Sequence, residues 1–173
     1  MAVDLWEFAV AFYERPGIRE QCLELQNSDG VDVCLLLVLV WLGASEVRLT
    51  PDQIRQLDAV MVEWRTQVII PLRNVRKFMA GNLRVSSGSN DKDMVAVYDS
   101  AKQLELRVEQ RAMREAALWL FDAALLMDGC CAADSAEIVR AIESNIRSYA
   151  DGFPQLSTSS VDRVCATFVS ALA

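Results

Sequence analysis

Basic residues provide the most suggestive chemistry in this sequence. The stretch from Arg65 to Arg84 has five basic residues and no acid. Within it, Arg73, Arg76 and Lys77 have the i, i+3 and i+4 spacing that puts side chains on one face of a helix. Guanidinium groups bind carboxylates and phosphates through paired hydrogen bonds. These five residues are therefore our candidate binding site for an acidic or anionic partner.

Pairing within the chain explains the same residues without any partner. The sequence has 24 acids against 17 bases, so neighbouring helices can supply carboxylates. A second row of bases, Arg107, Arg111 and Arg114, is mixed with glutamates, and Arg111 stands four residues before Glu115. That spacing favours an ion pair along a helix. We interpret this second row as a solvated or salt-bridged face.

Groups for catalysis or metal binding are scarce. The sequence has no histidine, which removes Ser-His and Cys-His nucleophile pairs and every imidazole metal site. Glu105 and Glu109 share a helical face, as in half of a dinuclear carboxylate site, but the histidines of such a site are absent. We predict no catalytic residue, no metal and no cofactor. The sequence argues against an enzyme without excluding one that uses carboxylates and arginines.

The five cysteines indicate free thiols. Cys22, Cys34 and Cys165 lie on apolar stripes and are predicted to be small core residues. Cys130 and Cys131 follow a glycine at the end of a predicted helix, where solvent can reach them, and we interpret them as incidental thiols.

Apolar residues at helical spacing predict an all-α fold. We expect one domain over residues 1–173, a bundle of seven or eight helices around a buried central helix at about 31–42. Thr50 and Gln53 have the spacing of a capping box. Pro71 should kink or break the helix that follows Thr50. Helices are expected to begin near residues 4, 16, 31, 50, 91, 135 and 160, with a short segment at 71–81 and a mobile loop near 84–90.

Composition restricts the kinds of partner. The net charge of −7 and a pI near 4.6 disfavour nucleic acid. The apolar run at 31–42 is shorter than the roughly 20 residues needed to span a bilayer. Acids near the N-terminus are unlike a signal peptide, which indicates a cytoplasmic protein. A homodimer through an exposed tryptophan or leucine face stays open.

Several N-terminal motifs resemble an uncharacterised proteobacterial family of small conserved hypothetical proteins. The motifs are Leu5-Trp6-x-Phe8-Ala9, Tyr13-x-x-Pro16-Gly17, Cys22-Leu23-x-Leu25-Gln26 and Gly30-x-Asp32-Val33-x-Leu35-Leu36-Leu37, with Trp64-Arg65 and Pro71-Leu72-Arg73 further along. Members often have asparagine where this chain has Cys34. The family has no assigned activity, so the resemblance implies a small helical bacterial protein and no catalytic residue.

Two functional hypotheses follow. The first is a non-enzymatic helical interaction protein that contacts an acidic or anionic partner through Arg65, Arg73, Arg76, Lys77 and Arg84. The alternative is a binder of a small apolar or amphipathic anionic ligand, held within the helical bundle with arginines orienting its head group. Core packing is the simpler explanation of the four tryptophans, although tryptophan also anchors interfaces.

Overall fold

The computed structural model describes residues 4–85, 92–126, 135–152 and 156–172, and all regular structure in these ranges is helical. The predicted all-α fold is confirmed. The α-helices are α1 (Leu5–Tyr13), α2 (Ile18–Glu24), α3 (Val33–Ala44), α4 (Pro51–Trp64), α5 (Ile70–Val85), α6 (Lys92–Asp122), α7 (Ser135–Ala150) and α8 (Thr158–Leu172), and the π-helical segments are η1 (Leu25–Asp29) and η2 (Arg65–Ile69). Most of the loop predicted at 84–90, together with Cys130 and Cys131, lies outside the described residues.

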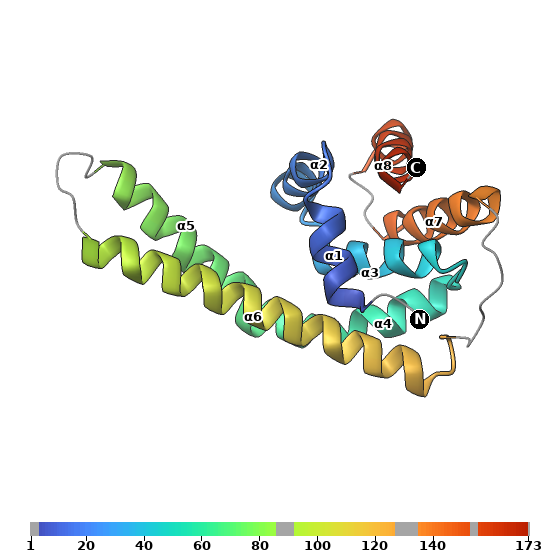
Figure 1. Ribbon diagram of the computed structural model, residues 1–173, viewed down its shortest axis with the longest axis horizontal. Helices are drawn as coiled ribbons and strands as arrows, with labels where there is room; N and C mark the ends of the chain where they lie inside the picture. Colours follow the sequence, from blue (N-terminus) through green and yellow to red (C-terminus); the bar gives the residue numbers. More distant parts are fainter. Residues whose placement is uncertain (1–3, 86–91, 127–134, 153–155, 173) are drawn as a thin grey trace.

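Helix α3 is the buried centre of the molecule, as the sequence predicts. Every residue from Cys34 to Gly43 is buried, and α1, α7 and α6 lie around the helix (Figure 1). The helix begins two residues later than predicted because Asp32 caps it, accepting hydrogen bonds from the backbone N–H groups of Cys34 at 2.9 Å and Leu35 at 3.3 Å.

Gly43 lies inside the last turn of α3 rather than marking its end. A Cβ atom at this position would stand 2.5 Å from Cγ1 and 2.7 Å from the backbone N of Ile142 in α7. The absent side chain therefore lets the α3 and α7 backbones approach closely. Asn145, also in α7 and fully buried, holds the same region, donating hydrogen bonds to the carbonyls of Leu39 and Val47 and accepting one from Leu49 N–H.

Residues 51–85 form one uninterrupted helical run through α4, η2 and α5. The predicted capping box at Thr50 and Gln53 is confirmed. Pro71 is predicted to kink or break this helix, and the break is wrong because the helix continues through it. Pro71 has no N–H to donate one turn back, and the wider turn of η2, in which Ile70 N–H bonds to the Arg65 carbonyl, absorbs this mismatch just before the proline.

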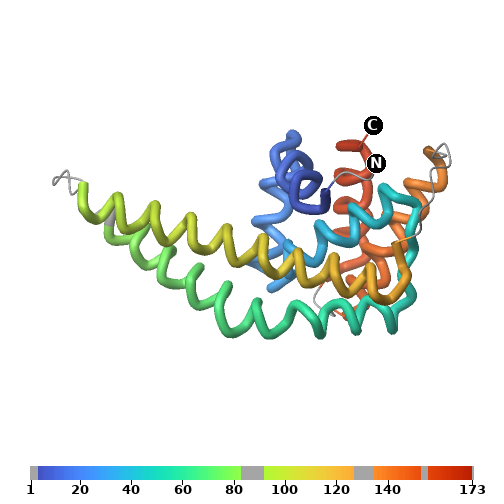
Figure 2. Tube along the Cα trace, turned by 60° about the horizontal axis from the view of Figure 1, so that its bottom comes forward, coloured from blue at the N-terminus to red at the C-terminus, as the bar shows by residue number. Residues whose placement is uncertain are grey.

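Helices α5 and α6 project from the body as an antiparallel arm. In Figures 1 and 2 the outer part of α5 and the first half of α6 extend away from α1, α2, α3, α7 and α8. Buried side chains on α6 begin at Glu105 and continue at Ala112, Met113, Ala116 and Leu120 toward the body. The outer part of the arm is thus held by the contact between its own two helices.

Candidate functional site

The predicted basic residues gather at the base of the arm, where η2 and α5 face α3 and α6. Arg65, in η2, donates hydrogen bonds from Nη1 to Oδ2 of Asp32 at 2.9 Å and to Oδ1 of Asp58 at 2.6 Å. Its side chain is one-fifth exposed. Both carboxylates raise the pKa of Arg65 against the opposing effect of burial. The charge of Arg65 is therefore compensated within the chain.

Arg73 and Arg76 converge on a single buried carboxylate. Arg73 Nε lies 2.9 Å from Oε1 of Glu105, and Arg76 Nε lies 2.5 Å from Oε2 of the same residue. Arg73 also donates from Nη2 to Oε1 of Glu109 at 2.7 Å. The Glu105 side chain is only 7% exposed. These contacts join α5 to α6 where the arm leaves the body.

The pKa values of the two glutamates in this cluster are shifted in opposite directions. Burial alone would raise the pKa of Glu105, but hydrogen bonds from Arg76 and Arg73 outweigh it and lower the pKa below its ordinary value. For Glu109, burial prevails over the attraction of Arg73, and the pKa is raised. Glu105 is accordingly the carboxylate that the two arginines hold ionised.

The remaining predicted basic residues lie farther out. Lys77 donates a hydrogen bond to Oδ1 of Asn27, in η1, at 2.9 Å. This acceptor is a neutral amide, so the lysine charge is not compensated by it. Arg84 belongs to α5, but its side chain is outside the description. The structure thus brings Arg65, Arg73 and Arg76 into internal ion pairs and leaves Lys77 on the surface.

The ion-pair partners of these arginines are not recognisable from sequence spacing. Asp32 caps α3 and also forms an ion pair with Arg65. Its backbone N–H also donates to Oη of Tyr149 at 3.1 Å, across 117 positions of sequence. Burial and the nearby Asp32 raise the pKa of Tyr149. Only the three-dimensional arrangement brings these distant residues together.

The described cysteines are structural. Cys22, Cys34 and Cys165 are free and buried, as predicted. Burial raises the pKa of Cys22 to about 12 and that of Cys165 to about 11, and raises that of Cys34 strongly. These thiols therefore stay protonated at neutral pH. Within the described ranges no group of three or more acids and cysteines is arranged to hold a metal ion.

The second arginine row contributes to a surface groove. The predicted pair between Arg111 and Glu115 is confirmed. Arg107 and Arg114 make no ion pair with any residue that the structure describes. With Trp6 they line an open groove of about 550 Å³ between the start of α1 and the middle of α6. Arg111 is thus salt-bridged, and Arg107 and Arg114 are exposed to solvent, in agreement with the prediction of a solvated or salt-bridged face.

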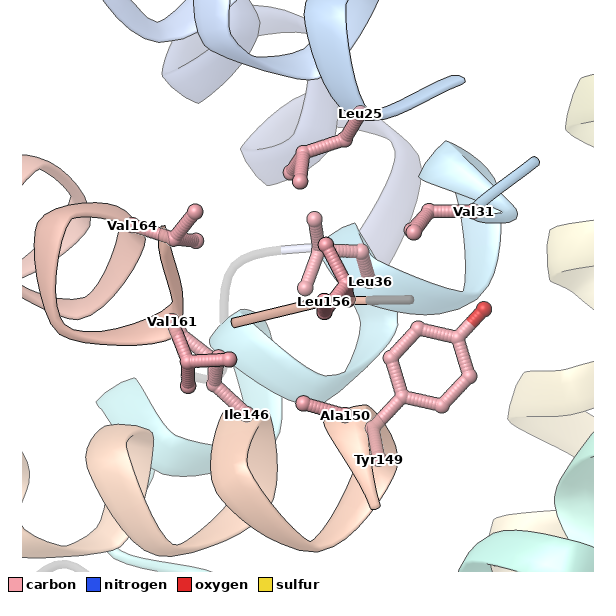
Figure 3. Close-up of a pocket in the computed structure, with 9 residues that line it drawn as sticks. All are labelled: Leu25, Val31, Leu36, Ile146, Tyr149, Ala150, Leu156, Val161 and Val164. Atoms are coloured by element: carbon pink, nitrogen blue, oxygen red, sulfur yellow. The ribbon is translucent and has the colours of Figure 1, made fainter. Parts of the chain in front are cut away.

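The apolar cavity formed by the described residues is too small for a ligand. An apolar cavity between α3, α7, α8 and η1 has a volume of about 20 Å³ and is drawn in Figure 3. Its lining includes Leu36, Ile146 and Val164. That volume holds about one water molecule, and the apolar walls offer a water no hydrogen-bond partner. This cavity cannot take the ligand of the alternative hypothesis.

Large apolar side chains remain exposed on the arm. Phe78 in α5 is 73% exposed, and Leu104 and Leu106 in α6 are about half exposed. By contrast, the tryptophans belong to the body: Trp41 is buried, and Trp6, Trp64 and Trp119 pack against the core. The sequence suggests an exposed tryptophan or leucine face for a homodimer. On the arm, leucines and Phe78 form the exposed apolar surface.

The fold and these contacts define a class of protein: an all-α body with a projecting helical arm whose base is fastened by buried ion pairs. No described helix has both the length and the apolar character required to cross a bilayer. Comparison with family models identifies the chain further. It belongs to the family described as Protein of unknown function (DUF2390), whose model matches residues 4–115.

The matched segment runs from α1 through most of α6. It therefore contains the whole arm and every ion pair at the base of the arm. Searches of curated proteins and of solved structures find no match.

Proposed function

We propose that this chain is a non-enzymatic helical interaction protein, and that its partner is a protein that binds the α5–α6 arm. One observation carries the proposal. The arm projects from the body, and almost three-quarters of the surface of Phe78, in α5, is exposed there. Phenylalanine buried at an interface contributes strongly to binding because of its large apolar area. An arm that is already folded loses little conformational entropy when a partner covers it.

The predicted basic residues keep a place in this proposal, but only some of them contact the partner. Arg65, Arg73 and Arg76 already bind carboxylates of this chain, and they support the arm. Lys77 adjoins Phe78 and has a neutral acceptor as its hydrogen-bond partner. An acidic partner would thus meet Lys77 beside the apolar contact, with Arg84 farther along α5. Charge at the rim of an interface mainly speeds association and selects the partner.

Phe78→Glu tests the arm, and Phe121→Glu is its matched control. Phe121 is the same residue type, is 72% exposed and lies at the C-terminal end of α6, outside the first half of that helix that extends away from the body. The tagged wild type and both variants are used to capture proteins from the host lysate. Each captured candidate is then purified, and its direct binding is measured by calorimetry. We expect Phe78→Glu to weaken binding at least tenfold and Phe121→Glu to leave it unchanged.

Lys77→Glu separates the electrostatic part of the proposal from the apolar part. We expect it to slow association with the purified partner and to make binding less dependent on salt. Circular dichroism checks that each variant is folded. A partner that binds wild type and Phe78→Glu equally contradicts the proposed arm interface.

A second copy of this chain is one outcome of the same experiment. Light scattering after size exclusion, at several concentrations, detects a dimer. If the arm joined two copies, Phe78→Glu would give a monomer and Phe121→Glu would not.

The cytoplasmic location and proteobacterial source belong to the proposal as well. The source is supported by the N-terminal motifs described above, and the location by the three described cysteines, which are all free thiols. Fractionation of host cells, with an antibody against the protein, tests the location.

A further inference from the structure

The groove between α1 and α6 is distinct from the base of the arm. Its volume of about 550 Å³ lies within the range of 300–1,000 Å³ found for small-molecule sites. It has a basic wall, formed by Arg107, Arg111 and Arg114 of α6, and the amide of Gln110 lies on the same helix. Trp6 and Leu5 of α1 provide its apolar side.

Two of the three arginines are available to a ligand. Arg111 is engaged with Glu115. Arg107 and Arg114 have no hydrogen bond or ion pair with any part of the chain that the structure describes. They are seven residues apart, which is two helical turns and about 10 Å along the axis, so both can reach one multiply charged anion. The two guanidinium forks suit phosphate oxygens better than a single ammonium group would.

Among the described lining residues, the one carboxylate has another role. Asp4 caps α1, where its Oδ1 accepts hydrogen bonds from the N–H groups of Trp6 at 2.9 Å and Glu7 at 3.3 Å. Three cations therefore line the groove together with one acid. This local excess of positive charge is unusual in a chain whose net charge is −7.

The apolar side selects the rest of the ligand. The indole of Trp6 is partly exposed, and Met113 beneath the groove is buried. A flat ring can stack on an indole, and a side-chain amide such as Gln110 can bond to the polar edge of a heterocycle. We propose that this groove binds a nucleoside phosphate, with its phosphates on Arg107 and Arg114 and its base against Trp6.

Calorimetry with ADP, adenosine and inorganic phosphate tests the proposal on the full chain. We expect ADP to bind at least tenfold more tightly than either of the other two, because only ADP contacts both sides of the groove. Absence of ADP binding at millimolar concentration would overturn the proposal. Inorganic phosphate binding as tightly as ADP would overturn the nucleoside assignment.

A charge-matched pair of variants locates the site. Arg107→Gln with Arg114→Gln removes two positive charges without breaking a described ion pair. Arg55→Gln with Arg163→Gln removes the same charge from exposed positions elsewhere. We expect the first pair to weaken ADP binding at least tenfold and the second to leave it within twofold. Equal affinity in both would contradict the assignment to this groove.

Fluorescence adds a readout that a purely structural effect would not produce. ADP should quench the tryptophan emission of the wild type. In Trp6→Phe the ring remains available for stacking, so ADP still binds while most of the quenching is lost. Phe78→Glu should keep the ADP affinity of the wild type, and this variant distinguishes failure of the groove from failure of the arm interface.

Discussion

Gly43 shows how a single absent side chain sets the distance between two helices. An added Cβ would overlap both the side chain and the backbone of Ile142, and backbone cannot move aside as a flexible side chain can. We expect Gly43→Ala to lower the free energy of unfolding by about 3 kcal/mol. Urea denaturation measures this change.

Gly81→Ala is the control for that substitution. Gly81 is also in a helix, but its added Cβ would meet nothing within 4 Å. Alanine has the better helix propensity, so a gain of about 0.5–1 kcal/mol is expected. Similar effects at both positions would show that propensity, and not the approach of α3 to α7, dominates at Gly43.

Glu105 should make the stability of the protein depend on acid. Its pKa is lowered by folding from an ordinary value of 4.5. The stabilisation from Glu105 is therefore complete above pH 4.5 and is lost as the pH falls through the lower pKa of the folded state. Glu105→Gln should cost about 3 kcal/mol at pH 7, because it leaves two arginines without their shared carboxylate.

Denaturation curves between pH 3 and pH 7 test the acid dependence. We expect the difference between the wild type and Glu105→Gln to shrink toward pH 3. Folding raises the pKa of Glu109, so its effect on stability has the opposite pH dependence. Its contribution to the free energy of unfolding is lost as the pH rises through the pKa of Glu109 in the folded state. A difference for Glu105→Gln that is constant with pH would contradict the role assigned to Glu105.

At this scale the sequence predicts helix caps better than ion pairs. A cap is local, so Asp32 and Thr50 can be recognised from neighbours within three positions. Glu105 binds Arg73 across 32 positions, and Asn145 binds Leu49 across 96. Such partners depend on how the helices pack, which the spacing of one helix cannot reveal. The groove beside Arg107 and Arg114 cannot be predicted for the same reason, since α1, which forms its other side, lies far from them in sequence.

At the scale of elements, Asp32 links the start of α3 to η2. It caps α3 and also binds Arg65. Asp32→Asn keeps a good cap and removes the charge, whereas Asp32→Ala removes both. We expect Asp32→Asn to lower the free energy of unfolding by about 1–2 kcal/mol, a loss limited because Asp58 still binds Arg65. Asp32→Ala should lower it by about 1 kcal/mol more, because it also removes the cap. Urea denaturation that finds equal losses would show that the cap adds nothing.

The helices themselves were largely predictable because most of them carry their own signals. The stripe after Thr50 is amphipathic, and the central run of leucine and valine is too long for an ordinary strand. Pro71 could not be interpreted locally. Whether a proline breaks a helix depends on whether the preceding turn can widen, and here η2 supplies that wider turn.

At the scale of the whole molecule, the arm makes the protein longer than a globule of the same size. A compact chain of 173 residues would have a radius of gyration of about 16 Å. Because the outer part of α5 and the first half of α6 lie away from the body, we expect X-ray scattering in solution to give a clearly larger value. A value near 16 Å would mean that the arm folds back onto the body.

The uninterrupted helix from α4 through η2 into α5 also has a mechanical meaning. It runs from the body into the arm without a loop, and α6 returns as a single helix of 31 residues, about 46 Å long. Buried ion pairs clamp the two helices together at the base. The arm is therefore expected to be stiff. A partner bound at its outer end would be held at a fixed distance from the body, and a force applied there would be transmitted to the body as a rotation.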